Sequence, residues 1–376
     1  MIRALIIASV LTLIPIFQPA FAEEKASQKE EEMKTIDDFV DGFKKMDGLF
    51  PIYHDEKTGA LYMELTPSNI GQEYIYHVYT ENGSPQLGLF RGGFRDNRII
   101  LIDKRYDQIE FSAQNTSYSF NQESALKRAS DANITRAPLA VSKIVATTGN
   151  GDAARYLIDL SAVVSSESLN QVTPWASPET KPGQQFSLGQ LSPEKTRVIK
   201  ARNYPNNTDV LVEYVFDNPQ PKHYGNASIT DARSVAISMQ HSFIALPKED
   251  FKSRKDDFRV GFFTSQATDL TTASYTPYND VINRWNLIKK NPSAALSDPV
   301  KPITWWIENT TPVELRETIR EAALSWNTAF EAAGFTNAIE VKVQPDNADW
   351  DSGDIRYNVL RWTCLLYTSP SPRDRG

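Results

Sequence analysis

The chain has 376 residues, of which 40% are hydrophobic, and it carries a net charge of −7 at pH 7. This length predicts two or three domains, and the hydrophobic content is sufficient for packed cores. The acidic balance argues against a nucleic-acid-binding protein, because binding to phosphates requires a basic face. The single cysteine, Cys364, excludes disulfides within the chain and leaves the preceding residues without a catalytic thiol.

The N-terminus has the three parts of a secretory signal peptide. Arg3 supplies a positive charge, an apolar stretch runs from Ala4 to Phe17, and Ala20-Phe21-Ala22 is a small-residue cleavage site. The apolar stretch is shorter than the roughly 20 residues that a membrane-spanning helix needs. We therefore expect cleavage after Ala22, a periplasmic or secreted protein, and no membrane span in the mature chain. Residues 23–35 are expected to be a charged linker.

Residues 36–280 are predicted to be rich in β-strands. Short runs of aromatic and β-branched residues alternate with turn signals, and the stretch from Asp55 to Gly59 is typical of a hairpin loop. Two short helices are expected, at 36–46 and 123–129. The predicted strands are 49–53, 61–65, 74–79, 98–102, 156–160, 196–199, 210–216 and 234–243.

The β-rich region contains no catalytic or metal-binding motif. His54-Asp55-Glu56 lies in the predicted hairpin loop, where acidic residues are ordinary turn formers. Gly92-Gly93 is more typical of a turn than of an anion-binding nest. The histidines of the chain, which are scattered without ligand spacing, are His54, His77, His223 and His241. We expect none of these residues to be catalytic, cofactor-binding or metal-binding.

Residues 303–363 predict a strand, a long helix and two further strands. Thr311 and Glu314 have the spacing of a capping box, with Pro312 at the first helical position. Gly334 is placed to end this helix in the left-handed conformation. Strands are expected at 303–307, 339–343 and 355–362. Apolar side chains at helical spacing form one stripe, which comprises Leu315, Ile319, Ala322, Ala323, Trp326 and Phe330.

Four blocks of sequence lie in order between residues 284 and 362. They are Arg284-Trp285-Asn286-Leu287-Ile288-Lys289-Lys290, Asp298-Pro299-Val300-Lys301-Pro302-Ile303, the stretch from Trp326-Asn327 through Glu331-Ala332-Ala333-Gly334-Phe335 to Ile339, and Asp354-Ile355-Arg356-Tyr357-Asn358-Val359 with Arg361-Trp362. These blocks closely resemble a family of exported bacterial zinc-dependent metallopeptidases, and weaker resemblance covers residues 36–363. The resemblance implies N-terminal domains of unknown function followed by a metzincin-like catalytic domain.

The expected fold class is therefore α+β, with a β-rich N-terminal region followed by the incomplete α/β start of a metzincin-like peptidase domain. In that start, a strand and a long helix precede further strands. The expected divisions are a signal peptide at 1–22, the charged linker at 23–35, the β-rich region at 36–280, the N-terminal part of the catalytic domain at 281–363 and a non-native tail at 364–376. The tail resembles translated adapter sequence at the end of a fragmentary gene model.

The resemblance implies hydrolysis of peptide bonds by a zinc-activated water in the full-length parent, with a peptide or protein as the substrate. That chemistry uses His-Glu-x-x-His on a helix, and no histidine follows His241 in this sequence. We therefore assign no catalytic residue and no zinc ligand. The chain is expected to be an inactive N-terminal fragment without a cofactor of its own, whereas the parent is expected to bind Zn²⁺.

Two other hypotheses stay open. In one, the chain is a non-catalytic periplasmic binding or interaction protein that uses its β-rich region. In the other, it is an enzyme of another class, such as a glycosidase with its site in the β-rich half. Paired carboxylates are too frequent in this sequence to single out a glycosidase pair.

Overall fold

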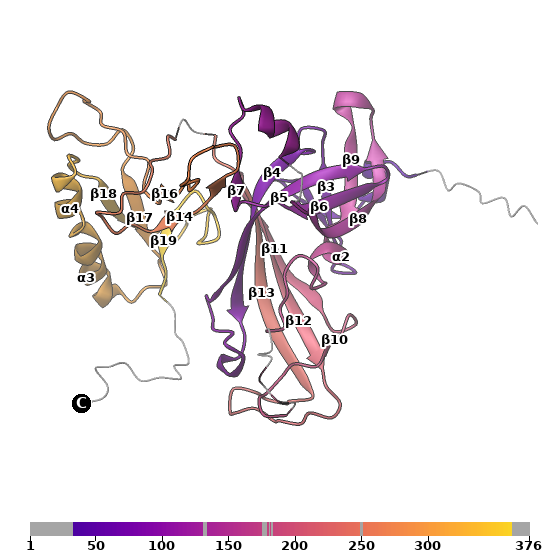
Figure 1. Ribbon diagram of the computed structural model, residues 1–376. Coiled ribbons are helices and arrows are strands. Elements are labelled where there is room, and N and C mark those ends of the chain that lie inside the picture. The colour runs from indigo at the N-terminus through magenta and orange to yellow at the C-terminus, as the bar shows by residue number, and fades with distance from the viewer. Residues whose placement is uncertain are drawn as a thin grey trace, which may run out of the picture. The chain divides into compact units, whose positions relative to one another are not determined.

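The computed structural model describes residues 33–130, 134–174, 179, 181, 183–248 and 251–362 (Figure 1). The predicted signal peptide, most of the predicted linker and the predicted tail lie outside these residues. From Lys34 onward the described residues belong to one unit. Among them, no helix has the length and apolar character needed to cross a membrane.

The largest part of the fold is a twelve-stranded sheet in which neighbouring strands pair antiparallel (Figure 1). Each strand predicted between residues 49 and 243 overlaps an observed strand, because the alternation of apolar residues is a local signal. In spatial order the strands are β1 (Lys44–Met46), β2 (Ile52–His54), β3 (Leu61–Leu65), β9 (Arg155–Asp159), β8 (Ala137–Thr148), β6 (Gln108–Ala113), β5 (Phe94–Arg105), β4 (Gln72–Asn82), β13 (Ser234–Ala245), β12 (Asn207–Asp217) and β10 (Gln190–Leu191), and β11 (Arg197–Asn203) also pairs with β12.

The hydrophobic core follows the alternation of these strands. In β4, the buried residues Tyr74, Tyr76 and Val78 alternate with neighbours that are partly exposed, as expected for a strand with one face in the core. β12 differs, because its first four residues, Asn207 to Val210, are all buried. Three of these four are polar, so the start of β12 requires hydrogen-bond partners on both of its faces.

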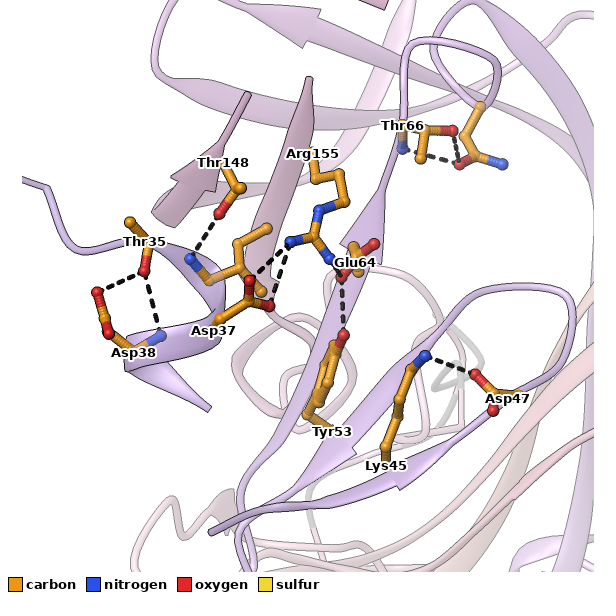
Figure 2. Close-up of polar contacts among 12 residues, drawn as sticks. Thr35, Asp37, Asp38, Lys45, Asp47, Tyr53, Glu64, Thr66, Thr148 and Arg155 are labelled. Atoms are coloured by element: carbon orange, nitrogen blue, oxygen red, sulfur yellow. Dashed lines mark hydrogen bonds and ion pairs between the residues drawn. The ribbon is translucent and has the colours of Figure 1, made fainter. Parts of the chain in front are cut away.

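A short helix, α1 (Ile36–Phe39), is held against the sheet by polar contacts (Figure 2). The hydroxyl of Thr35 caps the helix by accepting a hydrogen bond from the Asp38 N–H at 3.2 Å. The Ile36 N–H donates to the hydroxyl of Thr148 at 2.9 Å. The helix predicted at 36–46 is thus wrong beyond residue 39, because Gly42 adopts a φ of 79° and the chain then enters β1.

Arg155 joins α1 to a buried carboxylate on β3 (Figure 2). Its guanidinium donates to Asp37 at 3.2 Å and to Glu64 at 3.4 Å, and the Tyr53 hydroxyl donates to Glu64 at 2.8 Å. Burial, together with the hydrogen bond to Glu64, raises the pKa of the Tyr53 hydroxyl. The Glu64 charge is therefore paired and hydrogen-bonded in the way that a buried charge requires.

The remaining short elements lie in the connections. The helical turns are η1 (Pro85–Leu87), η2 (Ala125–Ala129), η3 (Gly151–Ala153) and α2 (Leu160–Val164). Two small sheets pair β7 (Tyr118–Ser119) with β15 (Thr268–Asp269) and β14 (Thr264–Ser265) with β16 (Val281–Ile282). The helix predicted at 123–129 is the 3-10 turn η2.

Residues 303–360 form a separate parallel sheet of three strands, in the order β18 (Ile339–Val343), β17 (Ile303–Ile307) and β19 (Asn358–Leu360). The helices α3 (Val313–Leu324) and α4 (Asn327–Ala332) connect β17 to β18. Ile319, Ala323 and Phe330 pack against the strands, whereas Trp326 is 65% exposed. The predicted apolar stripe is therefore only partly covered.

The predicted α+β fold class with a metzincin-like start is wrong. Strands make up 36% of the structure and helices 12%, and the large antiparallel sheet dominates. The expected long helix is two shorter helices, and neither contains a buried residue. The β-rich region holds the main core, whereas residues 303–360 form only a short three-stranded sheet with two helices, so β structure determines the class.

The predicted capping box is also wrong. Thr311 lies in a turn in which its N–H donates to the Glu308 carbonyl at 3.0 Å. Its buried hydroxyl has no hydrogen-bond partner, and α3 begins after Pro312 without a side-chain cap. The predicted left-handed end of the helix is confirmed, because Gly334 has a φ of 93°.

Candidate functional site

Asp55 and the Gly92-Gly93 pair have local structural roles. Asp55 accepts hydrogen bonds from the Lys57 N–H at 2.9 Å and from the Thr58 hydroxyl at 2.7 Å, which is ordinary chemistry for a hairpin loop. Gly92-Gly93 closes the turn between β4 and β5 through bonds with the Thr80 backbone. Over the described ranges, no three His, Cys, Asp or Glu side chains are grouped so that they could hold a metal ion.

His241 is the only one of the four histidines with no exposed surface, and it lies between two tyrosines. The Tyr76 hydroxyl is 2.7 Å from Nδ1, and the Tyr214 hydroxyl is 2.8 Å from Nε2. Because Tyr214 donates its proton to the Val164 carbonyl, it must accept from Nε2–H, and Nδ1 must accept from Tyr76. Burial lowers the pKa of His241 to about 3. This histidine is a neutral, fully satisfied core residue.

A second buried polar cluster lies at the start of β12. The Asp209 side chain is only 4% exposed, and its carboxylate accepts a hydrogen bond from the Asn207 side-chain amide at 2.8 Å. Ser242 on the neighbouring strand β13 also bonds to it. Burial raises the pKa of Asp209 to about 6, although these hydrogen bonds act in the opposite direction. A carboxyl group with a pKa near neutrality marks a candidate functional position.

The same cluster binds the loop 351–356, which precedes β19. The Asn207 side-chain amide donates through Nδ2 to the Gly353 carbonyl at 2.9 Å, and its Oδ1 accepts from the Ile355 N–H at 3.2 Å. A Cβ at Gly353 would lie 2.9 Å from the Asp209 carboxylate. The loop therefore approaches β12 so closely that only glycine fits at this position without a shift of its neighbours.

Asp351 adds a charged contact on the same loop. The Tyr204 hydroxyl donates to its carboxylate at 2.5 Å, and Arg202 Nε lies 3.1 Å from the other carboxylate oxygen. Burial acts to raise the pKa of Asp351, but the Tyr204 hydrogen bond and the Arg202 charge outweigh it, and the pKa is lowered. We call Tyr204, Asn207, Asp209, Asp351 and Gly353 together the β12 junction.

A cavity of about 50 Å³ lies beside the junction. It is lined by Tyr79, Glu81, Lys200, Arg202, Asp209, Leu211, Gln240 and Arg361. This volume accommodates water molecules but is far below the roughly 300–1,000 Å³ of a typical ligand site. The junction is therefore suited to holding a segment of chain in place rather than to binding a substrate.

Sequence reasoning missed this junction. Asn207 and Gly353 are 146 positions apart, and no local pattern links positions at that separation. The only local signal is the polar triplet Asn207-Thr208-Asp209 directly before the apolar run from Val210. Such a triplet is equally typical of a turn that leads into a strand.

The described geometry is thus that of an antiparallel β protein with a buried polar junction. Residues 95–290 match the family described as DUF5117, a domain of unknown function. The chain belongs to this family, because the match covers more than half of its length. No curated protein and no solved structure matches the chain.

Proposed function

We propose that the large sheet of this chain is a non-catalytic scaffold that orders an accompanying segment, residues 344–361, and that it does so in an exported zinc-dependent metallopeptidase. The observation that carries the scaffold role is the β12 junction. Asn207 is 2% exposed and uses its side chain to bond both to Asp209 and to the backbone of the loop 351–356. A buried amide that is satisfied in this way fixes the loop in one position.

The peptidase association is supported by the resemblance of residues 284–362 to that family. In the blocks that carry the resemblance, Asn327 and Asp354 have structural roles. Asn327 donates to the Ile339 carbonyl at 3.1 Å and accepts from the Ile339 N–H at 2.8 Å. Asp354 is fully buried and pairs with Arg356 at 2.6 Å. The residues described here do not fit a zinc site, so we derive no catalytic step and assign this part of the protein a supporting role.

The scaffold role predicts that Asn207→Ala releases the loop 351–356. The loss of the bonds to Gly353 and Ile355 lowers the free energy of local opening, and we expect tryptic cleavage after Arg356 to become about ten-fold faster. Cleavage at this residue is measured by mass spectrometry over a time course.

Asn226→Ala is the matched control, because Asn226 lies in an exposed turn and bonds only within that turn. We expect the control to leave cleavage after Arg356 unchanged. Equal cleavage rates in Asn207→Ala and the unsubstituted chain would contradict the scaffold role. Accelerated cleavage at every Lys and Arg would also contradict it, since that result reports global unfolding.

The peptidase association requires a different test. We expect the complete gene in genomic DNA to encode His-Glu-x-x-His in the same reading frame as residues 34–362. A complete frame without this motif would contradict the association and leave the scaffold role intact. The chain would then fit the second candidate, a periplasmic interaction protein, which is favoured by the exposed aromatic residues near Phe258.

A further inference from the structure

An exposed aromatic surface lies in the connection between β13 and β17. Phe258 is 97% exposed and Phe263 is 89% exposed, and Phe251 and Phe262 are 41% and 38% exposed. Single exposed apolar side chains are normal on a protein surface, but several large ones in one short segment mark an interaction site. We call residues 251–263, together with Arg284, the aromatic–basic loop.

Backbone pairing brings the two ends of this loop and Arg284 together. The Ile282 N–H donates to the Arg254 carbonyl at 2.9 Å, and the Asn283 N–H donates to the Phe263 carbonyl at 2.8 Å. The Arg284 guanidinium donates to the Lys252 carbonyl at 2.5 Å. β16 is therefore flanked by both ends of the loop, which fixes their position.

Cationic side chains lie among the aromatic rings. The Arg284 guanidinium carbon is 4.5 Å from the centroid of the Phe251 ring, and that of Arg254 is 5.7 Å from the centroid of Phe262. Both distances are typical of cation–π contacts. The guanidinium groups of Arg254 and Arg284 are therefore positioned by phenylalanine rings in the same segment that exposes Phe258 and Phe263.

The surface is electropositive within an acidic chain. Its cations are Lys252, Arg254, Lys255, Arg259 and Arg284, and the nearby carboxylates are Asp256, Asp257 and Asp280. These five positive and three negative charges give a net charge of +2, and the adjoining Lys248, Glu249 and Asp250 lower it to +1, while the whole chain carries −7. Arg259 is paired with Asp257 at 2.6 Å. The charge complementarity therefore favours an anionic partner.

The Phe258 and Phe263 rings project into solvent, with 97% and 89% of their surface exposed. A cavity of about 500 Å³ beside Asp280 is lined by Ser117, Gln266, Ala267, Thr268, Tyr278 and Asp280, and by none of the four phenylalanines. A peptide partner requires a concave groove with pockets, whereas a lipid interface accepts projecting aromatic and basic side chains.

We propose that the aromatic–basic loop binds the surface of an anionic lipid bilayer. Phe258 and Phe263 enter the boundary between headgroups and acyl chains, and Lys252, Arg254, Lys255 and Arg284 contact the lipid phosphates. Aromatic side chains supply the apolar part of such binding, and each basic residue adds electrostatic attraction. The protein is attached peripherally through this loop and independently of the β12 junction.

The test is co-sedimentation of residues 23–376, without the apolar stretch from Ala4 to Phe17 that would itself bind lipid, with vesicles of phosphatidylcholine alone or mixed with phosphatidylglycerol. We expect binding to the mixed vesicles, weaker binding to phosphatidylcholine, and a decrease as salt concentration rises. Phe258→Ser combined with Phe263→Ser is expected to weaken binding to mixed vesicles about ten-fold or more. Lys252→Gln combined with Lys255→Gln is expected to reduce the preference for the anionic lipid.

Phe94→Ser combined with Tyr106→Ser is the matched control, because these side chains are 66% and 92% exposed but lie on or next to β5. The proposal is overturned if the chain does not sediment with mixed vesicles at low salt, or if the control variant loses as much binding as the Phe258/Phe263 variant. It is equally overturned if the chain is a dimer that dissociates on replacement of Phe258 and Phe263, because the surface is then a contact between copies.

Discussion

Replacement of His241 by Leu is expected to destabilise the chain by about 2–5 kcal/mol. His241 fills a completely buried position and accepts the hydrogen bond of Tyr76. Leucine leaves the Tyr76 hydroxyl without a partner in the core, and such an orphaned buried group costs its full desolvation free energy. The free energy of unfolding is measured by urea denaturation with tryptophan fluorescence.

A double-mutant cycle separates the hydrogen bond from packing. Tyr76→Phe alone leaves Nδ1 of His241 without a donor, but Tyr76→Phe combined with His241→Leu removes both partners. The combined variant is expected to lose less stability than the sum of the two single variants. His77→Leu is the control, because His77 is only partly buried on the adjacent strand. Additive losses in the cycle would show that the Tyr76–His241 bond contributes nothing specific.

The unsubstituted protein is expected to lose stability relative to the Asp209→Asn variant as pH rises from about 4 to about 7. Burial raises the pKa of Asp209 from 3.8 to about 6. Between these two values the folded state keeps a proton that the unfolded state has released, so the free energy of unfolding falls as pH increases. The full effect is about 3 kcal/mol, and it is constant above a pH of about 6.

Several neighbours share the surroundings of this carboxyl group. Asn207 and Ser242 bond to it, Arg202 attracts its charge and Asp351 repels it. Glu81, Lys200 and Arg361 line the adjacent cavity. The side-chain amide in Asp209→Asn retains an oxygen that accepts from Asn207, so the variant removes the titration with little change in shape. Urea denaturation of both proteins across this pH range measures the difference.

Asp231→Asn serves as the control with the opposite sign. Asp231 is paired with Arg233, and the hydrogen bonds from Arg233 lower its pKa to about 2. Its contribution to stability is therefore present at neutral pH and is lost as pH falls toward 2. A stability difference for Asp209→Asn that does not vary with pH would show that this carboxyl group is ionised in the folded protein.

The strands could be predicted from the sequence because their signals are local. The alternation of side chains from Tyr74 to Tyr79 predicts a strand with one face in the core, and this signal does not depend on distant residues. Gly334 was likewise identified from its position after a helical run. The predicted cap fails for a local reason. The Thr311 hydroxyl was assigned to a cap, but the turn with Glu308 places it elsewhere.

The β12 junction could not be predicted because each half is ordinary when taken alone. In the sequence, Asn207 and Asp209 are typical polar residues before a strand, and Asp351 to Gly353 are typical of a surface turn. Only the folded chain brings them together, and the burial of Asp209 raises the pKa of its carboxyl group. Nothing in composition or spacing distinguishes this aspartate from the other carboxylates of the chain.

The order of the sheet and the loop 351–356 along the sequence also has a consequence for folding. Every strand of the twelve-stranded sheet lies between Lys44 and Ala245, so during synthesis the whole sheet emerges before the loop 351–356. Contacts over such long sequence separations form late, because loop closure must precede them. The sheet therefore assembles first and acts as a template, and the contact between Gly353 and Asn207 forms after it.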